Sequence, residues 1–125
     1  MLAIVLVGVG GFLGSVLRYL LGGWVQRALD NPWFPYGTLL VNLIGCLVIG
    51  FLAELTNNRQ VFTPEIRLFL FLGLLGGFTT FSSFAYETSA LLNNGQVGLA
   101  SFNVGLQVIL GLVAVWIGSY LSRLI

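Results

Sequence analysis

Four long apolar segments dominate this sequence and limit what it can fold into. They cover about residues 2–25, 36–55, 66–92 and 97–121, and each is close to the roughly 20 residues that a helix needs to cross a bilayer. They are continuously apolar rather than alternating, which excludes a β-barrel. Hydrophobic residues make up 58% of the 125 and charged residues 7%, more apolar surface than so small a soluble domain could bury. The sequence therefore predicts an all-α, multi-pass membrane protein with a single four-helix transmembrane domain over residues 1–125.

The same composition excludes several kinds of functional site. There is no histidine and no lysine, and Cys46 is the only cysteine. A zinc or haem site built from His and Cys, a disulfide framework and a basic surface for nucleic acid are therefore excluded. Four scattered carboxylates offer few groups for general acid–base or nucleophilic catalysis. We therefore expect that the protein is not an enzyme.

The arginines show almost no preference for one side of the membrane. Four spans place both termini and the middle connection on one side, which carries Arg59, Arg67 and Arg123. The other side has Arg27 and, near that helix end, Arg18. Positive charge normally gathers on the cytoplasmic side, so a chain this balanced can insert in both orientations. Unless a loop boundary is misplaced, the sequence predicts dual topology in the plasma (inner) membrane, with two copies pairing in opposite orientations.

Turn residues indicate where a helix begins, and glycines indicate where helices pack closely. Thr63 is a predicted helix N-cap, with Pro64 at the first helical position. Small residues spaced four apart let helix backbones approach closely in a membrane. Close packing is the preferred interpretation of the glycines at 10, 11, 14, 45, 50, 105, 111 and 118, together with Ser15.

The third segment carries the most specific polar signal. Its apolar run ends at Gly73 and is followed by Gly76-Gly77-Phe78-Thr79-Thr80-Phe81-Ser82-Ser83-Phe84. Glycine weakens a helix and hydroxyl side chains compete for its backbone groups, so we expect a break in mid-membrane. Broken backbone at this depth is tolerated only where it is buried or lines an ion or water site. The alternative is a glycine-rich helix that is merely kinked.

Aromatic and amide side chains extend this polar region. Phe78, Phe81 and Phe84 recur every three residues on one expected helical face, and the positive ring edges of such a stripe weakly favour an anion. Core packing is the alternative. Asn42 follows Thr38 by four residues in the second segment, and the fourth segment contains Ser101, Asn103 and Gln107. These groups either hydrogen-bond between helices or line a polar track.

Arg18 and Glu87 are the most deeply placed charges. Charged side chains within a membrane segment are candidates for function by default. Arg18 lies near one expected helix end, so its side chain could also reach the interface. The role of Glu87 is open.

Three motifs, one in each of the first three segments, share their pattern with a known family. They are Gly11-x-x-Gly14-x-x-x-Arg18-Tyr19, Gly37-Thr38-Leu39-x-Val41-Asn42-x-x-Gly45 and the glycine- and threonine-rich string that begins at Gly76. These motifs resemble the Fluc (CrcB) family of small microbial fluoride channels. The resemblance covers the whole chain, and the third string is its most specific part.

The resemblance implies a dual-topology homodimer with two antiparallel pores, each built from both subunits. It also implies a structural sodium ion, held by the backbone carbonyls of Gly76 and Thr79 from each copy. The pore phenylalanines of the family correspond to Phe81 and Phe84, and its pore asparagine corresponds to Asn42. Thr80 and Ser83 fall in the same hydroxyl-rich stretch, and Thr38 precedes Asn42 on the same face.

The fourth segment departs from the family pattern. A tyrosine and a serine four residues apart are expected on the pore side, and this chain has Asn103 and Gln107 there. We expect a passive, fluoride-selective channel whose anion coordination differs at these two positions. A small multidrug exporter is a weaker alternative, because the first segment lacks the embedded carboxylate that proton coupling needs. A non-transporting membrane assembly subunit would leave the helix break and Asn42 unexplained.

Overall fold

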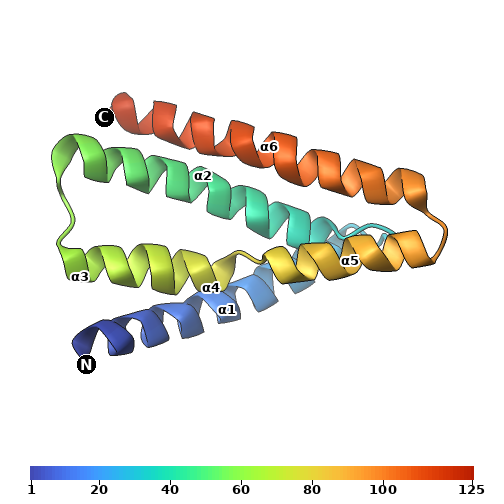
Figure 1. Cartoon of the computed structure of the whole chain (residues 1–125), viewed down its shortest axis with the longest axis horizontal. Coiled ribbons are helices and arrows are strands. Elements are labelled where there is room, and N and C mark those ends of the chain that lie inside the picture. Colours follow the sequence, from blue (N-terminus) through green and yellow to red (C-terminus); the bar gives the residue numbers. More distant parts are fainter.

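Four long helical spans make up the computed structural model, which describes all 125 residues (Figure 1). The first is α1 (Leu2–Ala28), the second α2 (Tyr36–Arg59) and the last α6 (Val97–Arg123). The third span runs over Pro64–Asn93 and is made of several pieces. Each span is long and apolar enough to cross a membrane. The helices extend a few residues beyond the predicted apolar segments, and the predicted all-α architecture with four spans is confirmed.

The third span is interrupted where the sequence predicts a break. It begins with α3 (Pro64–Arg67), whose N-cap Thr63 accepts a hydrogen bond from the Ile66 N–H at 3.4 Å, as predicted. A π-helix, η1 (Leu68–Leu75), and the short α4 (Gly76–Phe78) follow, and α5 (Phe81–Asn93) completes the span. Between α4 and α5 the backbone is extended. Wider π turns often occur next to functional sites, and no local signal in the apolar run predicted this one.

The helices pack as two pairs that meet where α1 contacts α2 and where α5 contacts α6. Helix α2 packs along α6, and α1 crosses beneath η1 and α4. Figure 1 shows both termini at the same end of the molecule as the connection between α2 and α3, as four spans require. The opposite end holds the α1–α2 and α5–α6 connections.

Glycine backbones make the closest helix contacts. A Cβ on Gly10 of α1 would lie 2.6 Å from the Phe69 carbonyl oxygen and 2.9 Å from the Gly73 Cα. On the other pair, a Cβ on Gly118 of α6 would meet the backbone at Leu47 of α2. The prediction of close packing holds at these positions. Gly105 makes no such contact within one chain, where a Cβ would have nothing within 4 Å.

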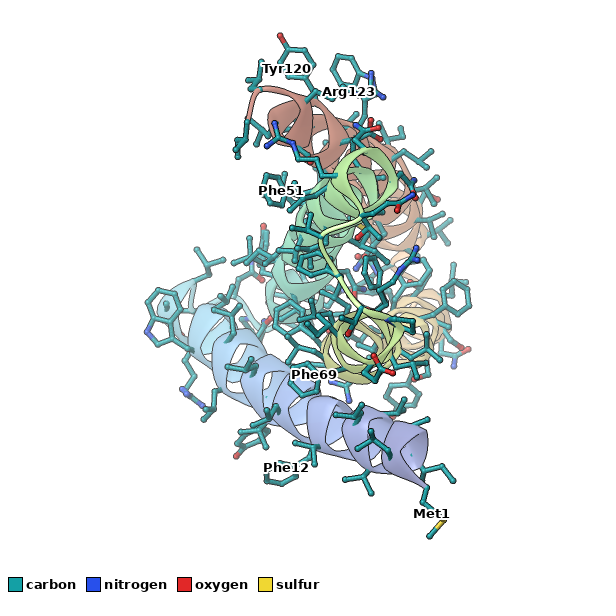
Figure 2. The ribbon with its side chains drawn as sticks, turned by 90° about the vertical axis from the view of Figure 1, so that its left-hand side faces the viewer. Met1, Phe12, Phe51, Phe69, Tyr120 and Arg123 are labelled. Carbon is teal, nitrogen blue, oxygen red and sulfur yellow. The ribbon has the colours of Figure 1, made fainter.

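Most of the apolar surface remains on the outside of the chain. Only 20 of 125 residues are buried, so the helices cannot be shielding their side chains from water within one copy. Figure 2 shows Phe12 of α1 and Tyr120 of α6 pointing outward on opposite sides of the molecule. An apolar exterior of this extent is suited to a bilayer or a second membrane-embedded chain.

Candidate functional site

The break in the third span is organised by Asn42 of α2. The Thr80 N–H donates to Asn42 Oδ1 at 2.9 Å, and Asn42 Nδ2 donates to the Thr80 carbonyl oxygen at 3.1 Å. In a continuous helix these two backbone groups would bond within the helix. The side-chain amide replaces the acceptor that the Thr80 N–H loses at the break. It also adds a second donor to the Thr80 carbonyl, which as the N-cap of α5 already accepts from the first turn of that helix.

The same break releases several carbonyl groups from helical bonding, those of Gly76 and Thr79 among them. A continuous helix would pair the Thr80 N–H with the Gly76 carbonyl, but this N–H is used by Asn42. The Ser83 N–H would pair with the Thr79 carbonyl, but it donates instead to Thr80 Oγ1, the N-cap of α5, at 3.2 Å. The Gly76 and Thr79 carbonyls are thus two of the oxygen groups that lose their helical partners where α4 ends.

Arg18 reaches the break rather than the membrane surface. Its Nη1 donates to the Thr79 carbonyl oxygen at 3.3 Å. The expectation that Arg18 lies near a helix end is wrong, because α1 continues to Ala28 and places residue 18 well inside the span. The guanidinium therefore adds a fixed positive charge beside the broken backbone.

Phe81 and Phe84 lie together on the first turn of α5. Their ring centroids are 5.4 Å apart in an edge-to-face arrangement. Both line a cavity of about 390 Å³, here called the Phe81 cavity, and no charged side chain lines it. Its lining also includes Asn42, Gly45, Cys46, Gly76, Thr79, Thr80 and Gln107.

The expectation that Phe78 continues this aromatic stripe is wrong. Phe78 ends α4 before the extended residues, and its side chain is buried. The extended backbone at Thr79 and Thr80 changes the direction of successive side chains, so a three-residue spacing across it no longer marks one face. Phe81 and Phe84 share the cavity because both follow the break.

The two amides of α6 are placed differently. Gln107 lines the Phe81 cavity, and its Oε1 accepts a hydrogen bond from Asn42 Nδ2 at 3.1 Å. Asn103 is fully buried and donates to Thr88 Oγ1 at 2.9 Å, away from both polar cavities. The structure therefore brings Gln107 to the predicted site residues and leaves Asn103 outside them.

Glu87 and Arg18 belong to a second, larger cavity of about 770 Å³, here called the Glu87 cavity. Thr38 Oγ1 donates to Glu87 Oε1 at 2.6 Å, which joins α2 to α5. Thr80 and Ser83 also line this cavity. Thr80 lines the Phe81 cavity as well, so both cavities meet this residue. Thr38 and Asn42 therefore share the α5-facing side of α2, as predicted, but they contact different cavities.

One residue near the Glu87 cavity was missed by the sequence interpretation. Gln26 of α1 donates to the Phe34 carbonyl oxygen at 3.0 Å and accepts from the Gly37 N–H at 3.1 Å. It thereby holds the α1–α2 connection against the cavity that it lines. Its signal in the sequence is an isolated amide near the end of an apolar segment.

The chain matches known proteins over almost its whole length. A family model described as CrcB-like protein, Camphor Resistance (CrcB), covers residues 5–119. A relative from Rhizobium meliloti named fluoride-specific ion channel FluC is 50% identical over 121 residues, which is 96% of this chain and 95% of the relative. Relatives of the same name from Agrobacterium fabrum and Geotalea daltonii are 46% and 42% identical, and cover 98% and 100% of this chain and the same shares of their own lengths.

These similarities decide the class of the protein. The relatives carry the name of an ion channel, not of an enzyme, and the four apolar spans make the chain a multi-pass protein of the plasma membrane. The resemblance seen in the sequence motifs is confirmed. The chain belongs to the CrcB-like family, whose named relatives are fluoride-specific ion channels.

Proposed function

We propose that the protein is a fluoride-selective channel through which fluoride leaves the cytoplasm passively. The observation that carries this proposal is the full-length similarity to relatives named fluoride-specific ion channels. The uncharged Phe81 cavity beside a broken helix supports it. The membrane potential, worth about 2.3 kcal/mol per charge per 100 mV, drives an anion outward when the cytoplasm is negative.

The groups around the break suit a small dehydrating anion. Hydroxyl and amide N–H groups can replace the water molecules that donate to fluoride, and the edges of Phe81 and Phe84 add weakly positive surface. A channel must bind its ion firmly enough to admit it but weakly enough to release it. The absence of any charged side chain from the lining of the Phe81 cavity favours release. A narrow path excludes the larger chloride ion.

In this proposal, a second copy of the chain completes the pore. The balance of arginines predicts that this copy inserts in the opposite orientation. Phe81 is 79% exposed in a single chain although it lines the proposed path, and Gly76 beside it is exposed as well. A conduction path cannot be left open to lipid along its side. Two copies in opposite orientations would cover this face and form two antiparallel pores, which supports a dual-topology homodimer.

The same pairing supports a structural sodium ion. The Gly76 and Thr79 carbonyls are among the groups freed from helical bonding, and two copies would offer four such oxygens from these two positions. Hard cations are bound by oxygen ligands of this kind. The residues present therefore fit the ion, which would supply a buried positive charge attractive to anions. Arg18 already donates to the Thr79 carbonyl, and the second lone pair of that oxygen remains for the ion.

Ion efflux from liposomes tests the proposed function. Purified protein is reconstituted with fluoride and chloride inside, and both ions are followed with selective electrodes after an ionophore for the counter-cation is added. Rapid fluoride release without chloride release is the expected result. Release of neither ion from a verified dimer, or release of both, would contradict a fluoride-selective channel.

A further inference from the structure

We propose that a cavity between the end of α2 and the beginning of the third span holds one anionic phospholipid, whose phosphate contacts Arg67. The cavity has a volume of about 440 Å³ and is here called the Arg67 cavity. It lies at the end of the molecule that holds the α2–α3 connection (Figure 1). The site does not depend on which ion the channel conducts, so its test is separate from that of the proposed function.

Arg67 lies close to the boundary between the hydrocarbon and the lipid headgroups. The break at residues 76–79 is at the centre of the span Pro64–Asn93, and Arg67 precedes Gly76 by nine residues. Nine residues of helix are about 14 Å long, and half of the hydrocarbon core is about 15 Å thick. The guanidinium ends a long side chain and therefore reaches the level of the lipid phosphates.

The Arg67 guanidinium is exposed and has no anionic partner within the chain. The single ion pair joins Arg123 to Glu54. Glu65, two residues before Arg67, does not line the cavity, because residues two apart on a helix do not face each other. Arg67 is the only charged residue in the lining. The planar guanidinium can donate two parallel hydrogen bonds to a phosphate, so a phosphate fits this position in both charge and geometry.

The wall of the cavity beyond Arg67 is apolar. It is formed by Ala53 of α2 together with Leu68, Phe71 and Leu72 of η1. Phe71 lies about 6 Å deeper than Arg67 along a helix, and the headgroup layer of a bilayer is about 5–7 Å thick. A lipid with its phosphate at Arg67 would therefore place the first part of an acyl chain against Phe71. Acyl chains match this apolar wall, whereas an anion without them would leave it in contact with water.

Charge favours a lipid over a second copy of the chain as the occupant. Phe71 also lines the Phe81 cavity, which the second copy covers in the proposed dimer. A copy in the opposite orientation would bring its α1–α2 and α5–α6 connections to the level of Arg67. The charged residues of these connections are Arg27 and Asp30, one of each sign. They offer no net negative charge, whereas every anionic phospholipid does.

Two substitutions separate the headgroup contact from the apolar contact. Arg67→Gln removes the guanidinium, and Ala53→Leu fills part of the apolar wall. Arg59→Gln at the same end of the molecule, but outside the cavity, is the control for the first. Ala3→Leu at the exposed beginning of α1 is the control for the second. Native mass spectrometry of purified, delipidated protein measures the binding of phosphatidylglycerol and phosphatidylcholine with the same acyl chains.

The wild type should bind one phosphatidylglycerol per chain, roughly tenfold more tightly than phosphatidylcholine, as one hydrogen bond between charged groups predicts. Arg67→Gln should abolish this preference, and Ala53→Leu should weaken the binding of both lipids. Both control variants should match the wild type.

Equal affinity of the wild type for the two lipids, or an unchanged preference in Arg67→Gln, would overturn the proposal. Loss of the dimer in lipid-free Arg67→Gln would overturn it in favour of a second copy. Glycerophosphoglycerol, which has no acyl chains, would indicate a free anion if it bound as tightly as phosphatidylglycerol. If Ala53→Leu does not assemble, Arg67→Gln alone decides the outcome.

Discussion

Side chains at the break have two kinds of role in this proposal. Holding residues form hydrogen bonds with the broken backbone, and lining residues border the cavity through which the ion passes. Asn42 satisfies both polar groups of Thr80, whereas Phe81 and Phe84 present ring edges to the cavity beside them. These roles have different consequences. A change in a holding residue should alter stability as well as flux, and a change in a lining residue should alter flux alone.

Replacing Phe81 tests the lining role. Phe81→Ile keeps an apolar side chain but removes the ring edge, so fluoride flux should fall on the order of tenfold, the size of a single aromatic edge contact. Phe12→Ile on the outward face of α1 is the matched control (Figure 2). Electrode-measured efflux from liposomes gives the comparison. Equal flux in the two variants would remove Phe81 from the path.

Replacing Asn42 tests the holding role. Asn42→Asp keeps the acceptor for the Thr80 N–H but removes the donor to Gln107 Oε1 and the second donor to the Thr80 carbonyl. Thermal unfolding in detergent should show a loss of about 1–3 kcal/mol, the usual result of leaving buried polar groups unpaired. Fluoride flux should fall as well. Asn57→Asp, at the exposed end of the same helix, should change neither quantity, and unchanged stability of Asn42→Asp would contradict the holding role.

At the scale of the elements, the position of α1 depends on glycine. Its backbone lies against η1 and α4 so closely that a side chain at Gly10 would collide with the backbone of Phe69 and Gly73. Backbone cannot move aside as a flexible side chain can. The same contact brings Arg18 to the Thr79 carbonyl, so the packing of α1 affects the electrostatics of the break.

Gly10→Ala should therefore lower the free energy of unfolding by about 1–3 kcal/mol, as overpacking of a tight contact does. Gly8→Ala on the same helix is the control, because nothing lies within 4 Å of the Cβ it adds. It should leave stability unchanged or raise it slightly, since alanine favours helix. Thermal unfolding of both variants measures the difference. Equal stability would show that α1 is free to shift away from η1.

At the scale of the whole molecule, function in this proposal depends on pairing two copies. The ends of the spans carry few charges, and only one ion pair forms, between Arg123 and Glu54 at 2.7 Å. Now that Arg18 is placed at the break, the end with the α1–α2 and α5–α6 connections keeps a single arginine, Arg27. The opposite end carries three arginines, so the difference is two, and a few added charges should decide the orientation.

Extra arginines test dual topology. Asn93→Arg with Asn94→Arg should hold the α5–α6 connection in the cytoplasm, and Asn57→Arg with Gln60→Arg should hold the opposite end there. Reporters fused to the C-terminus measure orientation. Each variant alone should lose most of its fluoride flux, and co-expression of the two should restore it. Full flux from either variant alone would exclude an obligatory antiparallel pair.

Removal of sodium tests the proposed cation site. Purification in N-methyl-glucamine instead of sodium should shift the protein from dimer to monomer, because four carbonyl oxygens at the interface would face one another without a cation. Size-exclusion chromatography measures this shift, and returning sodium should reverse it. A dimer that is equally stable without sodium would contradict the site at Gly76 and Thr79.

The sequence by itself determined the elements whose causes are local. Hydropathy specified four spans, Thr63 and Pro64 specified a helix start, and the glycines and hydroxyls after Gly73 specified a broken third span. Hydropathy, capping and helix propensity act between neighbours along the chain, so they can be read from a single sequence. The π-helix before the break is the exception, because its apolar residues are compatible with an ordinary helix as well.

Only the tertiary structure decided which polar atoms are satisfied and which are left free. Asn42 forms hydrogen bonds with Thr80 and Gln107, which are 38 and 65 positions away along the chain. Arg18 donates to the Thr79 carbonyl, 61 positions away. Such pairings depend on how whole helices pack, and a polar residue in an apolar segment gives no sign of its partner. For the same reason Asn103 and Gln107, one turn apart on α6, have different surroundings: Asn103 is fully buried and donates to Thr88, whereas Gln107 lines the Phe81 cavity and accepts from Asn42.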